Sequence, residues 1–298
     1  MANPTPALQA YQHKVLQMRL SSAIDFPAHV HLETMAQCNA ACDFCPYPGL
    51  VRKGTVMDDA LIAKVVNDLA DIPRLHTFQL SPFKVNEPFL DKRLFDLLDE
   101  FTVRLPNASL TLTTNASPIT FDKLQRLSGF SNIGYLWISF NDHRQAEYES
   151  AMQLPYRRTL ERLQMIHKAK AEGWLPLRVV LSRVGDGTAT DLAFRQWVEM
   201  NFPLFSASIF PRGEWIGQVA TARTSPPPEI GCVRWFDVSI TATGVVAHCC
   251  MDGAAAYPIG NVRFEHVLEI YNKPEFRQLR AATMIRQEVD PCRSCSFT

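Results

Sequence analysis

The sequence of 298 residues has no excess of charge of either sign, because 30 basic residues balance 30 acidic ones. Without a net charge the chain has no global field to attract nucleic acid or an anionic membrane surface, so we expect neither partner. It also lacks an apolar run of about 18 residues, which a membrane-spanning helix needs. The N-terminal segment has no secretory signal pattern. We therefore expect a cytoplasmic protein that acts on a small or neutral partner.

What the sequence does contain is cysteine, with eight residues in all. A reducing compartment disfavours a disulfide framework, so clustered cysteines there indicate metal or redox chemistry. Hydrophobic residues make up 47% of the chain, enough for a large core. The cysteines form two groups, one near each end: Cys38, Cys42 and Cys45, then Cys232, Cys249, Cys250, Cys292 and Cys295.

Short β-branched runs alternate with longer helical patterns over residues 29–210, which is typical of βα units around a parallel sheet. The helical pattern at 58–70 has Asp58 as a plausible N-cap, and the pattern at 156–173 ends at Gly173. Six units without a seventh and eighth predict an α/β fold, a partial (β/α)6 barrel. The expected strands are 29–34, 75–81, 108–115, 133–140, 177–183 and 205–210.

A composition break at Pro226 to Pro228 predicts an extended linker. Beyond it we expect a hairpin turning near Thr243 and Gly244, and a broken helix over 265–283. The predicted domains are an N-terminal extension (1–28), the partial barrel (29–224) and a small C-terminal α+β domain (225–298).

Cys38, Cys42 and Cys45 follow the first expected strand at C-x-x-x-C-x-x-C spacing. Three thiolates can hold a corner of a four-iron cluster and leave one iron open for a ligand, whereas four would close the site. Zinc completed by a distant ligand and exposed thiols are the alternatives. Zinc motifs favour paired C-x-x-C units, so the cluster is the better interpretation.

The spacing, with the aromatic Phe44 before the last cysteine, resembles the radical S-adenosylmethionine (radical SAM) superfamily. The resemblance covers nearly the whole chain. It implies a cluster whose open iron binds S-adenosylmethionine (SAM), and reductive cleavage of SAM to a 5′-deoxyadenosyl radical that takes a hydrogen atom from substrate. Phe44 is also a possible stacking surface, although a lone aromatic is more often part of the core.

Further positions resemble the family's cofactor site, each at the carboxyl end of an expected strand. The segment "KVNEPFLD" resembles the G-G-E-P motif, which implies that Glu87 receives the methionine ammonium; Val85 and Asn86 replace the glycines, and the Asn86 side chain is a candidate cofactor ligand. An ordinary loop carboxylate is the alternative for Glu87.

Two later segments extend the resemblance. "TLTTNAS" implies that Thr114 and Asn115 line the cofactor pocket, with a simple turn as the alternative. "WISFND" nominates Ser139 and Asn141, while Asp142 equally fits the N-cap of the next helix.

Two arginines, Arg183 and Arg212, follow the fifth and sixth expected strands. Each either clamps a carboxylate or phosphate of cofactor or substrate, or forms an ordinary surface ion pair.

The C-terminal cysteines can encase a second cluster or hold zinc with four thiolates. Beside the first motif, the G-x-x-x-x-C hairpin and closing C-x-x-C resemble the SPASM and twitch extensions, which bind auxiliary four-iron clusters. Five cysteines are too few for two such clusters, so the shorter twitch form fits better. Cys250 is then a small buried residue on the opposite strand face, and His248 a strand residue. The implied ligands are Cys232, Cys249, Cys292 and Cys295.

The layout is similar to that of the aminocyclitol dehydrogenases of the superfamily, which implies hydrogen abstraction followed by oxidation through the auxiliary cluster. The candidate proton acceptors are Arg212, Glu214 and His143.

The main rival hypothesis is a maturase of a ribosomally made peptide. The 28 residues before the first strand are too few for a leader-binding domain, so a separate leader-binding protein would have to supply it. A non-catalytic zinc protein is the third hypothesis. A flavodoxin or ferredoxin is the expected reductant.

Overall fold

The structure, a computed structural model, describes residues 6–221, 229–281, 284–295 and 297. Pro226 to Pro228, on which the predicted linker rests, lie outside the described residues. The helices are α1 (Pro6–Arg19), α2 (Asp59–Ala70), α3 (Leu94–Arg104), α4 (Phe121–Ser128), α5 (Gln145–Met152), α6 (Tyr156–Ala171), α7 (Ala189–Asn201), α8 (Val267–Tyr271) and α9 (Pro274–Ala281). The strands are β1 (His29–Leu32), β2 (Phe78–Ser81), β3 (Ala108–Thr114), β4 (Ile133–Ser139), β5 (Val179–Gly185), β6 (Ser206–Pro211), β7 (Asp237–Ile240), β8 (Val245–Ala247) and β9 (Pro258–Asn261).

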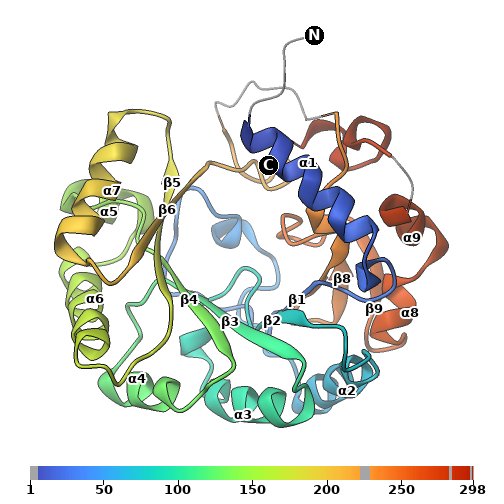
Figure 1. The fold of residues 1–298 in the computed structure, drawn as a ribbon, viewed down its shortest axis with the longest axis horizontal. Coiled ribbons are helices and arrows are strands. Elements are labelled where there is room, and N and C mark those ends of the chain that lie inside the picture. Colours follow the sequence, from blue (N-terminus) through green and yellow to red (C-terminus); the bar gives the residue numbers. More distant parts are fainter. Residues whose placement is uncertain (1–5, 222–228, 282–283, 296, 298) are drawn as a thin grey trace.

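One curved sheet organises the chain, in the order β6-β5-β4-β3-β2-β1-β7-β8-β9. Strands β1 to β6 are parallel and consecutive, and α2 to α7 cover the outer face of the sheet (Figure 1). All six expected strands are therefore confirmed, and so is the partial (β/α)6 barrel. Parallel strands put their carboxyl ends at one edge, which gathers the loops that follow them.

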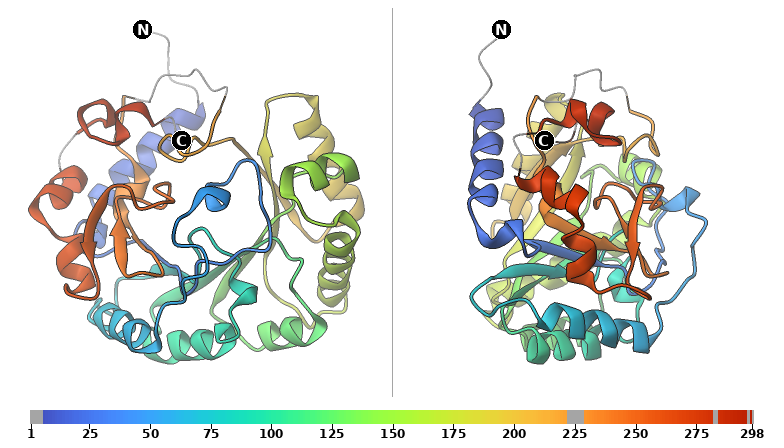
Figure 2. Two further views of the ribbon diagram at one scale, coloured as in Figure 1. Left: turned by 180° about the vertical axis from the view of Figure 1, so that it is seen from behind. Right: turned by 90° about the vertical axis from the view of Figure 1, so that its right-hand side faces the viewer.

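The C-terminal part of the chain continues this sheet instead of forming a sheet of its own. Strand β7 pairs in parallel with β1, and His29 lies opposite Asp237 in the register. Strands β7 and β8 form the hairpin predicted near Thr243 and Gly244. Gly244 has φ +87, a conformation that glycine adopts without strain. The described part of the predicted C-terminal domain thus lies beside the open edge of the barrel, as Figure 2 shows from behind.

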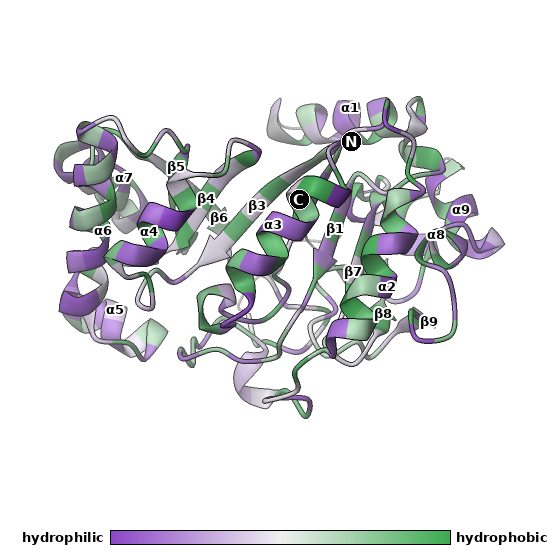
Figure 3. Ribbon diagram, turned by 90° about the horizontal axis from the view of Figure 1, so that it is seen from below, coloured by the Kyte–Doolittle hydropathy of each residue, from purple (hydrophilic) through white to green (hydrophobic). Residues whose placement is uncertain are grey.

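Helix α2 illustrates how the outer layer forms. The Asp58 carboxylate accepts a hydrogen bond from the Leu61 backbone N–H at 2.8 Å, which confirms the predicted N-cap. Apolar residues at helical spacing are buried against the sheet, and the polar residues other than the buried Asp68 lie on the outer side (Figure 3). The buried apolar residues of this helix are Leu61, Ile62, Val65, Val66 and Leu69.

Two other predicted helices agree with the structure in type and differ slightly in bounds. Helix α6 ends at Ala171, and Gly173 follows with φ +81. The broken helix over 265–283 is α8 and α9, separated just before Pro274, which cannot continue a helix. Within the described ranges, no helix combines the length and apolar character needed to cross a membrane.

The N-terminal helix α1 lies across the C-terminal segment (Figure 1). The Arg19 guanidinium donates a hydrogen bond to the Met284 carbonyl at 3.3 Å, and Arg286 donates to the Tyr11 hydroxyl at 2.8 Å. The region expected to be a simple N-terminal extension therefore covers part of the C-terminal domain.

Candidate metal centres and cofactor site

The loop after β1 brings the thiols of Cys38, Cys42 and Cys45 together. Burial is the main cause that raises the pKa of Cys38 to about 12 and that of Cys45 to about 11, and it also raises the pKa of Cys42. Neighbouring thiols add to the rise at Cys38 and Cys42. Thiolates so placed are stable only beside a positive partner such as metal ions. The donor set therefore fits an iron-sulfur cluster held by three thiolates.

Glu87 lies beside this loop and is only 1% exposed. Its carboxylate accepts hydrogen bonds from the Thr114 hydroxyl at 2.7 Å and from the Asn115 backbone N–H at 2.7 Å. The Phe89 backbone N–H donates a third at 3.2 Å. Burial raises the pKa of Glu87 to about 7, although these donors oppose the rise. The charge of Lys123 also acts on this carboxylate, but none of the described residues forms an ion pair with it, so it can accept hydrogen bonds from an ammonium group.

Asn115 joins the loop after β3 to the cysteine loop. Its amide nitrogen donates to the Asn39 side chain at 2.9 Å and lies 4.0 Å from the Cys38 sulfur. Asn39 in turn donates to the Ser117 hydroxyl at 2.8 Å. The structure thus brings together three of the predicted site residues, Glu87, Thr114 and Asn115, next to Cys38.

Asn86, by contrast, uses its side chain inside its own loop. Its amide oxygen accepts from the Lys84 backbone N–H at 2.9 Å, and its amide nitrogen donates to the Pro82 carbonyl at 3.3 Å. The amide therefore fixes the loop that carries Glu87, and a contact with the cofactor stays a prediction.

The residues predicted after β4 and β5 form a connected network. Asn141 has φ 63, and its amide oxygen accepts from the Val184 backbone N–H at 2.9 Å. Ser139 ends β4 and is partly buried. Arg183 is 5% exposed and binds Asp142 at 2.8 Å, together with Asp186 at 2.9 Å and Asp191 at 2.8 Å. The guanidinium is thus engaged by three carboxylates.

The segment after β6 docks on the cysteine loop. The Arg212 guanidinium pairs with the Asp43 carboxylate at 3.1 Å, and the Trp215 indole N–H donates to the Phe44 carbonyl at 3.0 Å. Glu214 lies near enough to Cys295 to raise the pKa of that thiol. These contacts place residues 212–215 between the two cysteine groups.

The His143 ring lies between Asp142 and helix α7, with its Nδ1 3.7 Å from the Asp142 carboxylate. Its ring packs near Phe194 and Trp197 of α7, with ring centroids 6.3 and 5.9 Å apart. Its role as a proton acceptor stays a prediction.

Four of the five C-terminal cysteines line one cavity. Cys232, Cys249, Cys292 and Cys295 all line it, together with Arg234 and Arg286, whereas Cys250 does not. A cavity lined by four thiols fits a closed four-thiolate cluster, the auxiliary site expected from the sequence.

Hydrogen-bond donors from distant parts of the chain surround these thiols. The Tyr11 hydroxyl lies 3.4 Å from the Cys232 sulfur, and the Trp235 indole donates to the Cys292 sulfur at 3.4 Å. The His248 Nε2 is 3.2 Å from the same sulfur. His248 is thus more than the plain strand residue expected from the sequence, since it follows β8 and contacts a predicted ligand. Its position beside Cys249 was the signal available; Tyr11 offered none.

Cys250 lies among polar groups rather than in an apolar core, which corrects its interpretation as a small hydrophobic residue. Burial raises the pKa of its thiol, but the Arg234 guanidinium and a hydrogen bond with His31 outweigh burial and hold the pKa below its usual value. Residue 250 follows the strand in a turn, so strand alternation did not apply.

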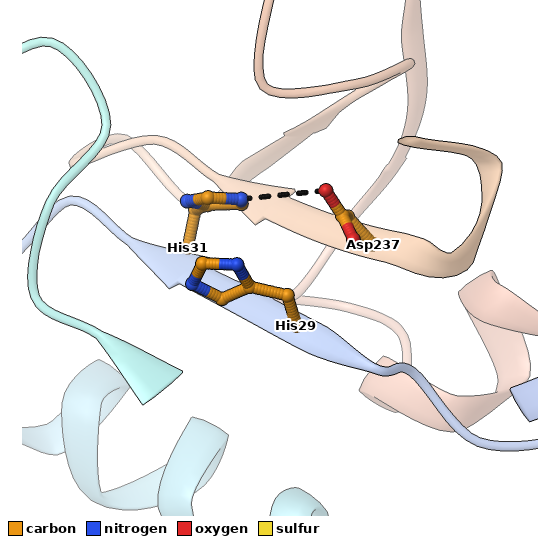
Figure 4. Close-up of side chains that lie close together, drawn as sticks. All are labelled: His29, His31 and Asp237. Carbon is orange, nitrogen blue, oxygen red and sulfur yellow. Dashed lines mark ion pairs between the residues drawn. The ribbon is translucent and has the colours of Figure 1, made fainter. Parts of the chain in front are cut away.

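His31 also faces Asp237, and His29 completes a group of three possible metal ligands (Figure 4). The His31 Nε2 lies 3.5 Å from the Asp237 carboxylate, but Arg234 binds the same carboxylate oxygen at 3.1 Å. The Nε2 of His29 is hydrogen-bonded to the Ser81 hydroxyl at 2.8 Å. A cation here would compete with the guanidinium, so the group is better described as a buried charge network.

Comparison with known proteins identifies one domain family in the sequence and several solved structures with a similar fold. Residues 232–296 match the family model of SPASM, an iron-sulfur cluster-binding domain. No curated protein matches the chain.

Three solved structures are similar at low sequence identity, so their likeness shows the fold. BtrN in complex with AdoMet and 2-DOIA is 18% identical with a TM-score of 0.59, over 91% of this chain and 93% of that chain. SuiB from Streptococcus suis bound to the precursor peptide SuiA is 13% identical with a TM-score of 0.68, over 99% and 76%. Native anSMEcpe with bound AdoMet and Cp18Cys peptide is 13% identical with a TM-score of 0.62, over 90% and 87%.

Proposed function

We propose that this chain is a radical SAM enzyme that uses its iron-sulfur cluster-binding SPASM domain to dehydrogenate a small natural-product, sugar or cyclitol-type substrate. The observation that carries the proposal is the pairing of two unlike cysteine sites. A three-thiol loop leaves one iron for SAM, and a four-thiol cavity leaves none, so the second cluster is suited to accept an electron.

The reaction balances as a two-electron oxidation. Cys38, Cys42 and Cys45 would hold a cluster that supplies the electron for cleavage of SAM to methionine and a 5′-deoxyadenosyl radical, which would take a hydrogen atom from a carbinol carbon. The four thiols of the C-terminal cavity would hold a cluster that accepts the remaining electron, and a base would take the hydroxyl proton, which leaves a ketone.

Residues of this chain have proposed roles in binding SAM. The Glu87 carboxylate would accept hydrogen bonds from the ammonium group of the methionine part of SAM. Thr114 and Asn115 hold the Glu87 carboxylate in place through their hydrogen bonds to it. Ser139, Asn141, Phe44 and Asn86 remain proposed contacts at the ends of their strands and loops.

Glu214 is the proposed proton acceptor. It is a carboxylate between the two cysteine groups, near Cys295. Arg212 is less suited, because a guanidinium does not release its proton near neutral pH and this one already pairs with Asp43. His143 is also less favoured, because its ring packs near Trp197 of α7.

A second candidate is a maturase of a ribosomally made peptide. It is favoured by the likeness to SuiB bound to its precursor peptide, which extends over 99% of this chain. A separate leader-binding protein is proposed for that case. In both cases we propose a flavodoxin or ferredoxin as reductant and a cytoplasmic location.

Deuterium transfer distinguishes the two. The reduced enzyme would be incubated with SAM and either carbon-deuterated aminocyclitols or deuterated peptides, and the 5′-deoxyadenosine analysed by mass spectrometry. Deuterium from an aminocyclitol, with formation of the ketone, supports the dehydrogenase. Transfer from peptides alone would replace it with the maturase.

A further inference from the structure

Lys84 is a buried lysine in the loop that joins the two cofactor sites. It follows β2, is 2% exposed and precedes Glu87 by three positions. Its ammonium group donates to the Ser239 hydroxyl at 2.9 Å and to the Asp252 carbonyl at 2.9 Å. The third contact is the Cys249 carbonyl at 3.5 Å. All three acceptors are neutral.

The described residues give this ammonium no carboxylate within ion-pair distance. The charge of Glu33 acts on this ammonium, but Arg52 already holds Glu33 through two hydrogen bonds of 2.7 and 2.8 Å. The Cys250 thiol, which also acts on Lys84, has Arg234 and His31 as its own partners. An ammonium buried without a counter-charge is costly, so a missing anion is expected nearby.

The auxiliary site supplies such an anion. Cys249, whose carbonyl Lys84 contacts, contributes its thiol to the four-thiol cavity. A four-iron cluster held by four thiolates carries net negative charge and gains one more on reduction. A fixed cation close to the cluster stabilises the reduced form more than the oxidised form, which raises the reduction potential.

We propose that Lys84 is the counter-charge of the auxiliary cluster and poises it to accept an electron. Lys84 thereby acts as a positioning and tuning residue through Cys249, without touching substrate. The loop 84–87 then serves both sites, with Lys84 directed to the auxiliary cavity and Glu87 to the cysteine loop. This inference needs the auxiliary cluster but not the proposed dehydrogenation, so either can fail alone.

The test is a redox titration of the anaerobically purified holoenzyme, monitored by electron paramagnetic resonance. Addition of SAM perturbs the signal of the cluster at the three-thiol loop and so identifies the other signal as the auxiliary cluster. Lys84→Met removes the charge and keeps much of the side-chain volume, and Lys84→Arg keeps the charge. Lys170→Met is the matched control, because Lys170 also donates to a backbone carbonyl but on α6.

We expect Lys84→Met to make reduction of the auxiliary cluster about tenfold less favourable, a fall of about 59 mV for one electron. Lys84→Arg should keep the reduction potential of the auxiliary cluster close to the wild-type value, and Lys170→Met should leave that potential unchanged. Loss of auxiliary iron in Lys84→Met but not in Lys84→Arg would support the same role. An unchanged potential in Lys84→Met with full iron would overturn the proposal, and so would equal loss of iron in both Lys84 variants.

Discussion

Replacing Glu87 by Gln tests the proposed SAM site through its pH dependence. The carboxylate is fully buried and its pKa is raised to about 7, because burial outweighs the three hydrogen bonds that it accepts. If Glu87 receives the SAM ammonium, SAM binds the ionised form of Glu87. Protonation at lower pH should then compete directly with SAM.

The magnitude follows from this pKa. The rise from 4.5 to about 7 corresponds to about 3 kcal/mol against ionisation in the folded chain. Because the folded-state pKa is the higher one, the cofactor-free protein loses stability as pH rises from 4.5 to about 7. SAM affinity should instead increase with pH. Between about pH 5.5 and 7.5 the ionised fraction of Glu87 rises about 25-fold for a pKa of about 7, and SAM affinity should rise by the same factor.

The assay is equilibrium binding of SAM to the anaerobic holoenzyme across that pH range. Below about pH 7.5 the amino group of SAM stays mostly protonated, so the slope reports the protein. Glu87→Gln should flatten the slope to less than about twofold and weaken binding at pH 7.5 by about 10- to 100-fold, as expected for a lost charge-assisted hydrogen bond. Glu172→Gln, which changes a carboxylate of the α6 C-cap, is the control. Equal slopes in wild type and Glu87→Gln would refute the assignment.

Other substitutions test the remaining assignments. Arg183→Met removes one of the two guanidinium partners of Asp142, and Arg144 remains at 2.9 Å, so the free energy of unfolding, measured with urea, should fall by about 1.5–3 kcal/mol. SAM affinity of the folded variant should change less than about threefold, and a larger loss would instead favour a direct contact with SAM. Cys249→Ala should reduce the iron content from about eight to about four per chain, because it opens the four-thiol site, whereas Cys250→Ala should retain about eight. The reverse pattern would exchange the roles of these neighbouring cysteines.

The fold was predictable because its signals are local. Alternation of β-branched runs with amphipathic helices identified all six barrel strands, and Asp58 marked the start of α2. The carboxyl ends of parallel strands lie at one edge of the sheet, and the loops that follow them are neighbours there. The proximity of Glu87, Thr114 and Asn115 could therefore also be predicted.

What the sequence could not predict depends on contacts between distant segments. The pairing of β7 with β1 merges the C-terminal region into the barrel sheet, and nothing in either strand's pattern selects that partner. The approach of Tyr11 to Cys232 spans 221 positions, and that of Lys84 to Cys249 spans 165. Cys250 was predicted to face away from Cys249 because neighbouring side chains alternate along a strand. Residue 250 lies in a turn after β8, where that alternation does not apply.

The most direct test of the account is the product formed from SAM. The anaerobically reconstituted protein, with about eight irons per chain, would be reduced with dithionite and incubated with SAM. We predict 5′-deoxyadenosine and methionine in equal amounts, and none from a variant in which Cys38, Cys42 and Cys45 are replaced by Ala. Absence of 5′-deoxyadenosine from the protein with full iron, or a preparation that holds two zinc ions instead, would contradict the account.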